Sequence, residues 1–431
     1  MRAHAVRPGM PTEAAAIVAA ADLSTAVQSV NGGVVVAPAP ATGPGRDATA
    51  HLTSAAGARP VAVSVVVVTW NGAALLDECL GALRAQTMAD RIEVVVVENG
   101  SADDSMAQIA RHGARLVIAG TDADVGDDAA DKRVAIGESP WLRVVVNDRN
   151  RGFATGCNQG IRVAHAPLVA LLNNDAVPEP AWLAELVGAL DRLPARTGAV
   201  TSKVVSYADR GAIDNVGHVV FADGLTRGRG RLARDRGQYS RIEEVFCASG
   251  CASLFRRAML DDVALAEDGG PFDDAFFAYC DDADLGFRAR LRGWRCFYVP
   301  TAVVAHRFSQ SSGAFSPLKA LNVERNRLWL AVRNLPLPLL LLSPLFTLAR
   351  YGWQGYGAFS GRGASGRFAQ ESSRGALASI LARAYWQALL GMPRALRQRR
   401  AIQRRRIAST RDVVRWLHRY GIGPRAIALL E

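Results

Sequence analysis

This sequence has few lysines, no cysteine pairs with CxxC spacing and no long apolar runs. The six cysteines show no CxxC spacing, which argues against a zinc ribbon or a small disulfide-bonded scaffold and favours a reduced setting. No uninterrupted apolar run reaches the roughly 20 residues of a membrane-spanning helix. Acidic residues interrupt the alanine-rich patch near Ile17, so no signal peptide is expected. We therefore expect a cytoplasmic protein.

Positive charge comes almost wholly from arginine. The formal net charge is +11, and the only lysines are Lys132, Lys203 and Lys319. From Arg350 onward arginines far outnumber acidic residues, which suits either nucleic acid or an anionic membrane. This basic tail has little aromatic interleaving and follows an apolar, proline-broken segment, residues 335–348. The combination favours peripheral contact with the inner face of the plasma membrane over nucleic-acid binding.

Composition divides the 431 residues into three parts. Residues 1–59 are rich in Ala, Gly, Pro and Thr without periodicity, and they are expected to form a disordered leader. Residues 60–316 contain an alternating strand and helix pattern, and residues 317–431 predict a helical, membrane-associated region. Within the middle part, residues 121–138 form an acidic insert that we interpret as a surface loop, with a calcium site as the less favoured alternative.

From residue 61 onward, four buried-strand patterns alternate with helical patterns. "VAVSVVVVTWNG" and "IEVVVVENGSADDS" are two of these apolar runs, and each ends in polar residues before a helix begins. The alternation predicts an α/β fold with a mainly parallel sheet and helices on both faces. Ligands bind beyond the carboxyl ends of such strands. The four predicted ends carry Thr69-Trp70-Asn71, Glu98-Asn99, Asn147-Asp148 and Asn173-Asn174-Asp175.

The residues at these ends have structural as well as functional interpretations. Asp175 is a hard oxygen ligand suited to Mg²⁺ or Mn²⁺, whereas Asp and Asn also favour polar turns. Glu98 can accept the imide N–H of a uracil or thymine, or it can serve as an acid near a helix N-terminus. His306 can complete a metal site or be structural. Asn173 and Asn174 can bond to a ribose or sugar hydroxyl.

A pair of acids begins a later predicted helix. In "YCDDADLGFRARLRGW", Asp284 and Arg288 have the spacing of an (i, i+4) ion pair, which accounts for both. The adjacent Asp281 and Asp282 must point in different directions. One can cap the helix while the other faces a cleft and acts as a general base.

Several segments, taken in order, make residues 61–312 resemble family 2 glycosyltransferases with the GT-A fold, particularly bacterial rhamnosyltransferase-like members. They are "VSVVVVTWNG", "VVVVENGSADDS", "NRGFATGCNQG", "LLNNDAVP", "SGCASLFRR", "FFAYCDDADLGFRARLRGWRCFYVP" and "AVVAHRFSQSSG". The resemblance implies a Rossmann-like mixed, mainly parallel sheet with helices on both faces. A helical region would follow this domain.

The resemblance also implies roles for individual residues. Glu98 matches the carboxylate that contacts the nucleotide base, commonly Asp in the family. Asp175 matches the remaining ligand of the DxD metal motif, and His306 matches a histidine that often completes a Mg²⁺ or Mn²⁺ site. Asp282 matches the catalytic base. The implied nucleotide-sugar-binding residues are Thr69, Asn71, Glu98, Asn99, Gly152, Phe153, Asn158, Asn173, Asn174 and Gly250.

The implied activity is inverting, metal-dependent transfer from a nucleotide sugar to a hydroxyl of a cell-wall, polysaccharide or lipid-linked glycan. We expect dTDP-rhamnose as the donor, and otherwise a UDP-sugar. Arg415 and Trp416 are present, but Asp412 stands where processive synthases of the family carry Gln, so one sugar per binding event is expected. The alternatives are a non-catalytic membrane scaffold with this fold and, less favoured, a nucleic-acid-binding protein.

Overall fold

The computed structural model describes residues 60–114, 116–119, 134–135, 141–265, 269–308, 316–363, 365–367 and 374–429. The expected leader, residues 1–59, lies outside the described residues, and so does the acidic insert apart from residues 134–135. The described residues fall within a single compact unit, 59–431.

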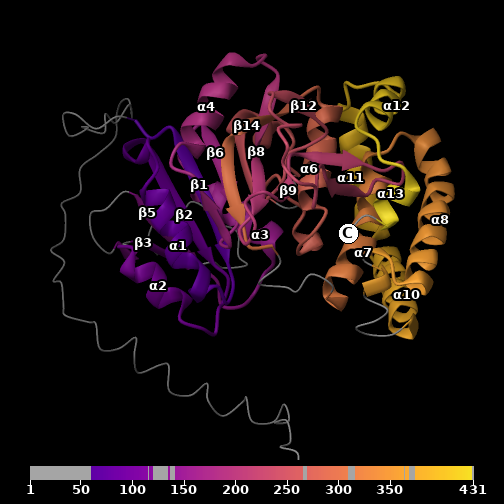
Figure 1. The fold of residues 1–431 in the computed structure, drawn as a ribbon, viewed down its shortest axis with the longest axis horizontal. Helices are drawn as coiled ribbons and strands as arrows, with labels where there is room; N and C mark the ends of the chain where they lie inside the picture. Colours follow the sequence, from indigo (N-terminus) through magenta and orange to yellow (C-terminus); the bar gives the residue numbers. More distant parts are fainter. Residues whose placement is uncertain are drawn as a thin grey trace, which may run out of the picture. The chain divides into compact units, whose positions relative to one another are not determined.

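Twelve of the described strands form one mixed sheet in the order β12-β14-β8-β13-β6-β1-β2-β5-β3-β4, with β7 beside β14 and β9 beside β8 (Figure 1). They are β1 (Val63–Thr69), β2 (Ile92–Glu98), β3 (Leu116–Ala119), β4 (Val134–Ala135), β5 (Leu142–Val146), β6 (Leu168–Leu172), β7 (Ala176–Pro178), β8 (Thr197–Ser206), β9 (Ile213–Asn215), β12 (Glu243–Val245), β13 (Ala252–Arg256) and β14 (Arg295–His306). A separate hairpin pairs β10 (His218–Val220) with β11 (Thr226–Gly228).

The four strands predicted from the sequence are parallel neighbours. β1 lies between β2 and β6, and β5 follows β2. Toward the other edge, β13 runs antiparallel to both β6 and β8, while β14 is parallel to β8. The carboxyl ends of β1, β2, β5 and β6 therefore meet at one edge of the sheet. This mixed α/β arrangement confirms the fold that the GT-A resemblance implies.

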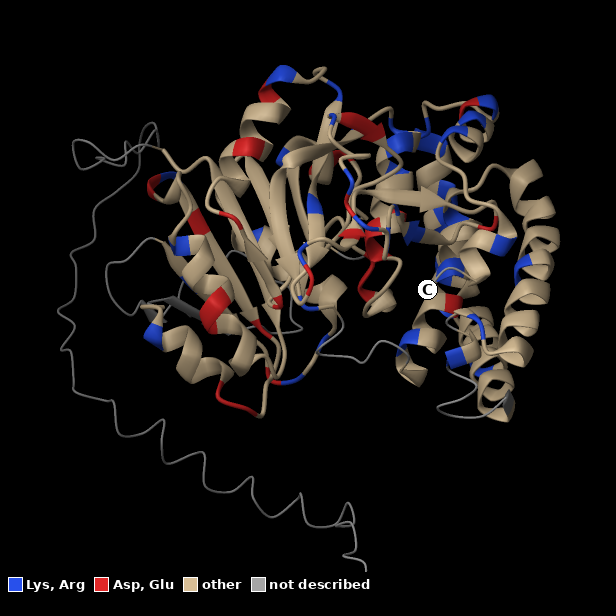
Figure 2. Cartoon of the chain, in the orientation of Figure 1, with Lys and Arg blue, Asp and Glu red and all other residues tan. Residues whose placement is uncertain are grey.

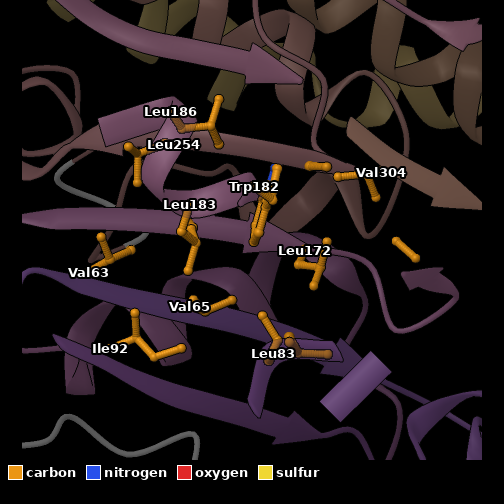
Figure 3. Packing of buried hydrophobic residues seen from close by; sticks show 14 of the residues in the cluster. Val63, Val65, Leu83, Ile92, Leu172, Trp182, Leu183, Leu186, Leu254 and Val304 are labelled. Atoms are coloured by element: carbon orange, nitrogen blue, oxygen red, sulfur yellow. The ribbon is translucent and has the colours of Figure 1, made fainter. Parts of the chain in front are cut away.

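Helices cover both faces of the sheet. They are α1 (Ala73–Arg84), α2 (Ser105–Arg111), α3 (Phe153–Val163), α4 (Trp182–Arg192), α5 (Arg257–Asp262) and α6 (Asp281–Leu291), with short 3₁₀ turns at Ala89–Arg91 and Asp274–Phe276. Along β1, Val63 and Val65 pack on one face with side chains of α1 and α4 (Figure 3), whereas Val66 packs on the other with side chains of α3 and α5. This alternation follows from the two-residue period of a strand. Both faces of the central strands are buried, as the valine-rich runs predict.

The C-terminal helices pack against this domain. They are α7 (Pro317–Asn334), α8 (Leu337–Ser360), α10 (Arg374–Leu390), α11 (Met392–Arg405), α12 (Thr410–Arg419) and α13 (Pro424–Leu429). A third core cluster joins Phe246 and Phe287 of the sheet domain to Trp329 of α7 and to Tyr420. The division at residue 316 stays a prediction, because buried contacts continue across it. Among the described helices, none combines the length and apolar character needed to cross a bilayer.

Candidate active site

The turn after β1 is built against the end of β6. Thr69 is buried, and its Oγ1 accepts a hydrogen bond from Asn174 Nδ2 at 3.0 Å. A Cβ on Gly72 would lie 2.3 Å from the same nitrogen, so a side chain at this position would displace Asn174. The two neighbouring strands are thus tied together at their carboxyl ends.

Glu98 and Asn71 join the loops that follow β1 and β2. The Glu98 carboxylate is 2% exposed and accepts backbone N–H bonds from Gly100 at 3.2 Å and Ser101 at 2.7 Å. Asn71 donates its own N–H to Ser101 Oγ at 2.9 Å. Because α2 begins only at Ser105, Glu98 is not a first-turn acid of that helix, and the helix-acid interpretation is corrected. Glu98 shapes the loop at the end of β2.

Asn99 lies in a buried amide network. Its Oδ1 accepts from Asn147 Nδ2 and from the backbone N–H of Arg151, each at 3.0 Å. Its Nδ2 donates to Asn150 Oδ1 at 3.1 Å and to the Gly152 carbonyl at 3.2 Å. These bonds use every donor and acceptor of the amide. The structure therefore gives Asn99 a positioning role in the turn that leads to α3, and its contact with a nucleotide sugar stays a prediction.

The N-terminus of α3 touches the loop that precedes α6. Gly152 has a φ of 86°, and a Cβ there would come within 2.5 Å of the Phe277 carbonyl oxygen. The Ala154 N–H donates to the same oxygen at 3.2 Å. The next side chain, Phe153, lies close to Gly250, where an added Cβ would be 3.5 Å from Phe153 Cε1. Glycine at position 152 allows the two backbones to approach.

Asn158 has a structural role. Its side chain is 2% exposed, and its Nδ2 donates to the Phe272 carbonyl at 2.9 Å and to Asp274 Oδ1 at 2.8 Å. Its Oδ1 accepts the Phe272 N–H at 3.0 Å. Both groups of the amide therefore hold the 272–274 loop. The expected contact of Asn158 with a nucleotide sugar stays a prediction.

Asp175 and His306 form a candidate metal pair. β7 begins just after Asp175 and places Ala176 opposite His306 at the end of β14. Asp175 Oδ1 and His306 Nε2 are buried and face each other 3.1 Å apart as an ion pair. Two such facing ligand atoms suit a divalent cation. In the described part, no set of three or more His, Cys, Asp or Glu side chains could by itself hold a metal ion.

Asp214 on β9 supports this pair, and the sequence had not singled it out. Its Oδ2 accepts from His306 Nδ1 at 2.6 Å, and its Oδ1 accepts from Arg231 at 2.5 Å. A carboxylate on the second ring nitrogen orients a metal-binding histidine. Burial alone would lower the pKa of His306, yet Cys251, Asp175 and Asp214 raise it well above its ordinary value. A bound cation would take the place of the proton on Nε2.

The carboxylates that begin α6 have different surroundings. The Asp282 side chain is 20% exposed and accepts N–H bonds from Gly250 at 3.0 Å and Ala283 at 2.7 Å. Asp281 is 6% exposed, and its Oδ2 is buried without a partner in the described structure. Burial, and then the charge of Asp282, raise the pKa of Asp281 to about 7. The N-cap is Cys280, so the interpretation that one acid caps the helix is corrected.

A histidine that the sequence patterns did not mark lies beside Asp282. His218 Nδ1, on the β10–β11 hairpin, is 3.8 Å from Asp282 Oδ2 and 3.4 Å from Cys247 Sγ. The imidazole is 8% exposed. It therefore contributes to the electrostatic surroundings of the candidate base.

Backbone bonds connect the metal pair to the acid pair. The N–H of Asn173, two residues before Asp175, donates to the Cys251 carbonyl at 2.8 Å. Cys251 follows Gly250, whose N–H holds Asp282. The predicted metal residues and the predicted base are therefore linked through Gly250 and Cys251.

The loop before α6 is strained and held from outside the sheet domain. Phe277, Tyr279 and Cys280 have φ values of 63°, 72° and 63°, which non-glycine residues rarely adopt. Asn326 on α7 is fully buried, and its Nδ2 lies 2.9 Å from the Phe276 carbonyl and 2.8 Å from the Tyr279 carbonyl. This amide helps to fix the segment that carries the acids.

Comparison with known proteins gives an independent result. Residues 64–264 match the family described as "Glycosyl transferase family 2". Over 260 residues the chain is 28% identical to an N-acetylglucosaminyl-diphospho-decaprenol L-rhamnosyltransferase of Mycobacterium tuberculosis, which covers 58% of this chain and 77% of that enzyme. Over 144 residues it is 31% identical to a validoxylamine A glucosyltransferase of Streptomyces hygroscopicus subsp. jinggangensis, across 33% of this chain and 27% of that enzyme.

Among solved structures, the chain is similar to a mannosyltransferase from Pyrobaculum calidifontis in complex with GDP-Man and Mn²⁺. The TM-score is 0.42 and the identity 19%, over 85% of this chain and 86% of that one. Several sequence relatives are spanned over only 25% to 33% of their length.

Proposed function

Because the chain contains a family 2 glycosyltransferase domain, we propose that it is an inverting enzyme that transfers one sugar from a nucleotide sugar to an acceptor hydroxyl. One observation carries this proposal: the Asp175–His306 pair and the Asp282 carboxylate are joined through Cys251 and Gly250 into a single site. A pair of facing ligand atoms and a partly exposed carboxylate are the groups that such a transfer requires.

Asp282 acts as the general base. It takes the proton of the acceptor hydroxyl as that oxygen attacks the anomeric carbon. The new C–O bond forms while the bond from the anomeric carbon to the diphosphate oxygen breaks, and its electron pair leaves with the nucleoside diphosphate. Attack from the opposite face inverts the configuration. The N–H groups of Gly250 and Ala283 hold the carboxylate in a fixed orientation for this step.

Asp175 and His306 would hold a divalent cation. When bound, such a cation supplies positive charge that stabilises the leaving diphosphate. Mg²⁺ usually needs only one or two protein carboxylates when substrate phosphates provide further ligands. Asp214 fixes the His306 ring through Nδ1 and leaves Nε2 facing Asp175, as a metal-binding histidine requires.

The donor that we propose first is dTDP-rhamnose, followed by UDP-sugars. The rhamnosyltransferase relative supports this order, and its name supports a lipid-linked or cell-wall glycan as the acceptor. A thermal-shift panel of nucleotide sugars tests the donor, because a ligand at 100 Kd adds roughly 2.7 kcal/mol to the free energy of unfolding. We expect stabilisation by dTDP-rhamnose to increase when Mn²⁺ is present.

Asp175→Ala is the decisive variant in that panel, and Asp148→Ala is its matched control, just after β5, another parallel strand of the same sheet. The Asp148 side chain is 60% exposed and lies outside the metal pair. We expect Asp175→Ala to lose the Mn²⁺-dependent stabilisation and Asp148→Ala to retain it. An unchanged Mn²⁺ response in Asp175→Ala would place the metal elsewhere. Donor binding without sugar transfer to any glycan would favour the scaffold alternative.

The polarity of α8 supports peripheral membrane contact. Its buried residues are Ser343, Thr347, Arg350 and Gly357. By contrast, Leu341, Leu345 and Leu348 are 70%, 63% and 65% exposed, and their i, i+4, i+7 spacing places them on one outer stripe. A helix that turns polar side chains inward and leucines outward suits hydrocarbon better than water.

The positive charge on the neighbouring helices also favours contact with an anionic membrane. Figure 2 shows that the α8 ribbon is almost uncharged, whereas α11 and α12 carry many Lys or Arg positions. Each basic residue near an anionic leaflet contributes about 1 kcal/mol to binding. We propose that the protein works at the cytoplasmic face of a membrane, where a lipid-linked acceptor would be presented.

A further inference from the structure

A group of cations from two separate segments, β11 with the turn after it and α7, lies next to the metal pair. Arg231 bonds to Asp214, the partner of His306, at 2.5 Å. The Arg231 guanidinium lies 3.7 Å from the centre of the Phe308 ring, and Lys319 Nζ lies 4.9 Å from the same centre. Arg227 on β11 is the third member, close enough to Arg231 for the two charges to interact.

These cations repel one another. Burial first, and then the charge of Arg231, lower the pKa of Lys319 to about 8. Burial and the same charge lower the pKa of Arg227 to about 10. Asp214 is a carboxylate whose charge acts on both Arg231 and Lys319, and it also accepts a hydrogen bond from His306. Gathering like charges in a half-buried place is unfavourable unless an anion offsets them.

The position of Lys319 indicates where such an anion would lie. Its Nζ lies 4.9 Å from the ring of Phe308, two residues after His306, and 5.6 Å from the ring of Tyr279, three residues before Asp282. Lys319 therefore lies near both the residues that follow His306 and the loop that leads to Asp282.

We infer that Arg227, Arg231 and Lys319 form a binding site for a phosphate or diphosphate group of a substrate. This inference rests on the proposed transferase function. The group can belong to the nucleotide-sugar donor or to a lipid-linked acceptor, and both offer the same charge and the same acceptor oxygens. The site differs from the Asp175–His306 pair because it needs no metal ion.

Binding of inorganic pyrophosphate in EDTA, measured by calorimetry, tests the site without any turnover. We expect Lys319→Gln and Arg227→Gln each to weaken binding about tenfold, since each removes a charge-assisted hydrogen bond. Lys319→Arg should retain binding. Arg234→Gln is the control, because that arginine is 63% exposed and pairs only with Asp209 among the described residues. Equal affinities in all four variants would overturn the inference.

Kinetics then identify the substrate. If the group belongs to the donor, Lys319→Gln raises the KM for the nucleotide sugar. If it belongs to the acceptor, the variant raises the KM for a prenyl-diphosphate-linked sugar and leaves unchanged the KM for the same sugar as an octyl glycoside. Weaker pyrophosphate binding with no change in either KM would show that no substrate uses the site. If the protein transfers no sugar at all, the proposed function fails, while the calorimetry still reports on the anion site.

Discussion

Asp281 and Asp282 are adjacent in the chain, yet they occupy different environments. Asp282 is partly exposed and is held by the Gly250 N–H, next to the backbone that leads to Asp175. Asp281 is buried, and one of its oxygens has no partner in the described structure. The sequence indicates only that two neighbouring carboxylates cannot share one role. Burial and the contact with Gly250 are what distinguish the base from its neighbour.

The Asp282→Asn variant should therefore lose sugar transfer but still bind the nucleotide-sugar donor. The amide has nearly the same shape but cannot take the proton, and removal of a general base costs roughly 10²–10⁴-fold in rate. Asp281→Asn should change the rate little, because the buried carboxyl is not placed to reach an acceptor. Calorimetry with the nucleotide sugar and parallel rate measurements separate the two effects. Wild-type rates in Asp282→Asn with loss in Asp281→Asn would reverse the assignment.

Asp281 should also make stability depend on pH. Its folded-state pKa of about 7 lies above the ordinary value of 3.8, so the folded protein holds this proton more tightly than the unfolded chain. The resulting stabilisation is complete below about pH 4 and is lost as the pH rises through 7, at up to about 1.4 kcal/mol per pH unit. Asp281→Asn cannot titrate and should lose less stability over this range.

Urea unfolding between pH 4 and pH 8 measures this difference. Asp104→Asn is the control, because Asp104 is an exposed acid at the start of another helix, α2. The wild-type protein and the control should show the same pH slope, and Asp281→Asn should show a shallower one. Equal slopes for all three proteins would mean that Asp281 is ionised in the folded state throughout.

Strands with long apolar runs could be predicted from the sequence, whereas the shortest strands could not. The valine runs of β1 and β2 and the run of β6 predict buried parallel strands, and their polar ends located the site edge. β9 and β10 have three residues each and no periodic pattern. Asp214 and His218, which these short strands carry, reach the site only through tertiary pairing. No local signal in the sequence marks them.

α7 was not predicted as part of the site, although Asn326 holds the strained loop before α6. Asn326→Ala would remove the side-chain donor to the Ala278 and Tyr279 carbonyls, at a cost of about 1–3 kcal/mol, and would let residues 277–280 relax. The Phe276 carbonyl would keep its bond from Arg325. We expect kcat to fall about tenfold, since small misplacement of a catalytic group is costly, while donor affinity stays unchanged.

Asn322→Ala is the matched control, one turn earlier on the same helix. Asn322 is 2% exposed, and its Nδ2 has no hydrogen-bond partner in the described structure. This variant should keep the wild-type kcat. Rates are compared at a temperature where circular dichroism shows both variants folded. If the two variants lose the same activity, the effect is general destabilisation of α7 rather than release of the loop.

Buried ion pairs join the C-terminal helices to the sheet domain. Arg333 of α7 lies 2.8 Å from Asp284 on the base helix, and Arg350 of α8 lies 2.9 Å from Asp223 near the β10–β11 hairpin. Removing one partner of such a pair costs about 3–5 kcal/mol, because the other charge stays buried. Deletion after residue 316 would therefore damage the sheet domain itself. Membrane contact has to be tested with substitutions on the outer surface.

Replacement of Leu341, Leu345 and Leu348 together by Glu is that test. Burial of each leucine in a bilayer contributes about 1.5–3 kcal/mol, and the new charges would also be repelled by anionic lipid. We expect the triple variant to stop sedimenting with anionic vesicles while it still transfers sugar to a water-soluble acceptor. Leu232→Glu, at a residue 58% exposed outside the C-terminal helices, should sediment like the wild-type protein.

Ionic strength separates the two contributions to this binding. Added salt screens the attraction between the arginines and anionic lipid, because the Debye length is about 10 Å at 0.1 M. The free energy of burying the leucines changes little with salt. Wild-type binding should therefore weaken in 0.5 M salt but persist, and binding to neutral vesicles should be weak yet measurable. If the triple variant sediments as well as the wild-type protein at every salt concentration, α8 does not face the bilayer. Its outer leucines would then need a protein partner to cover them.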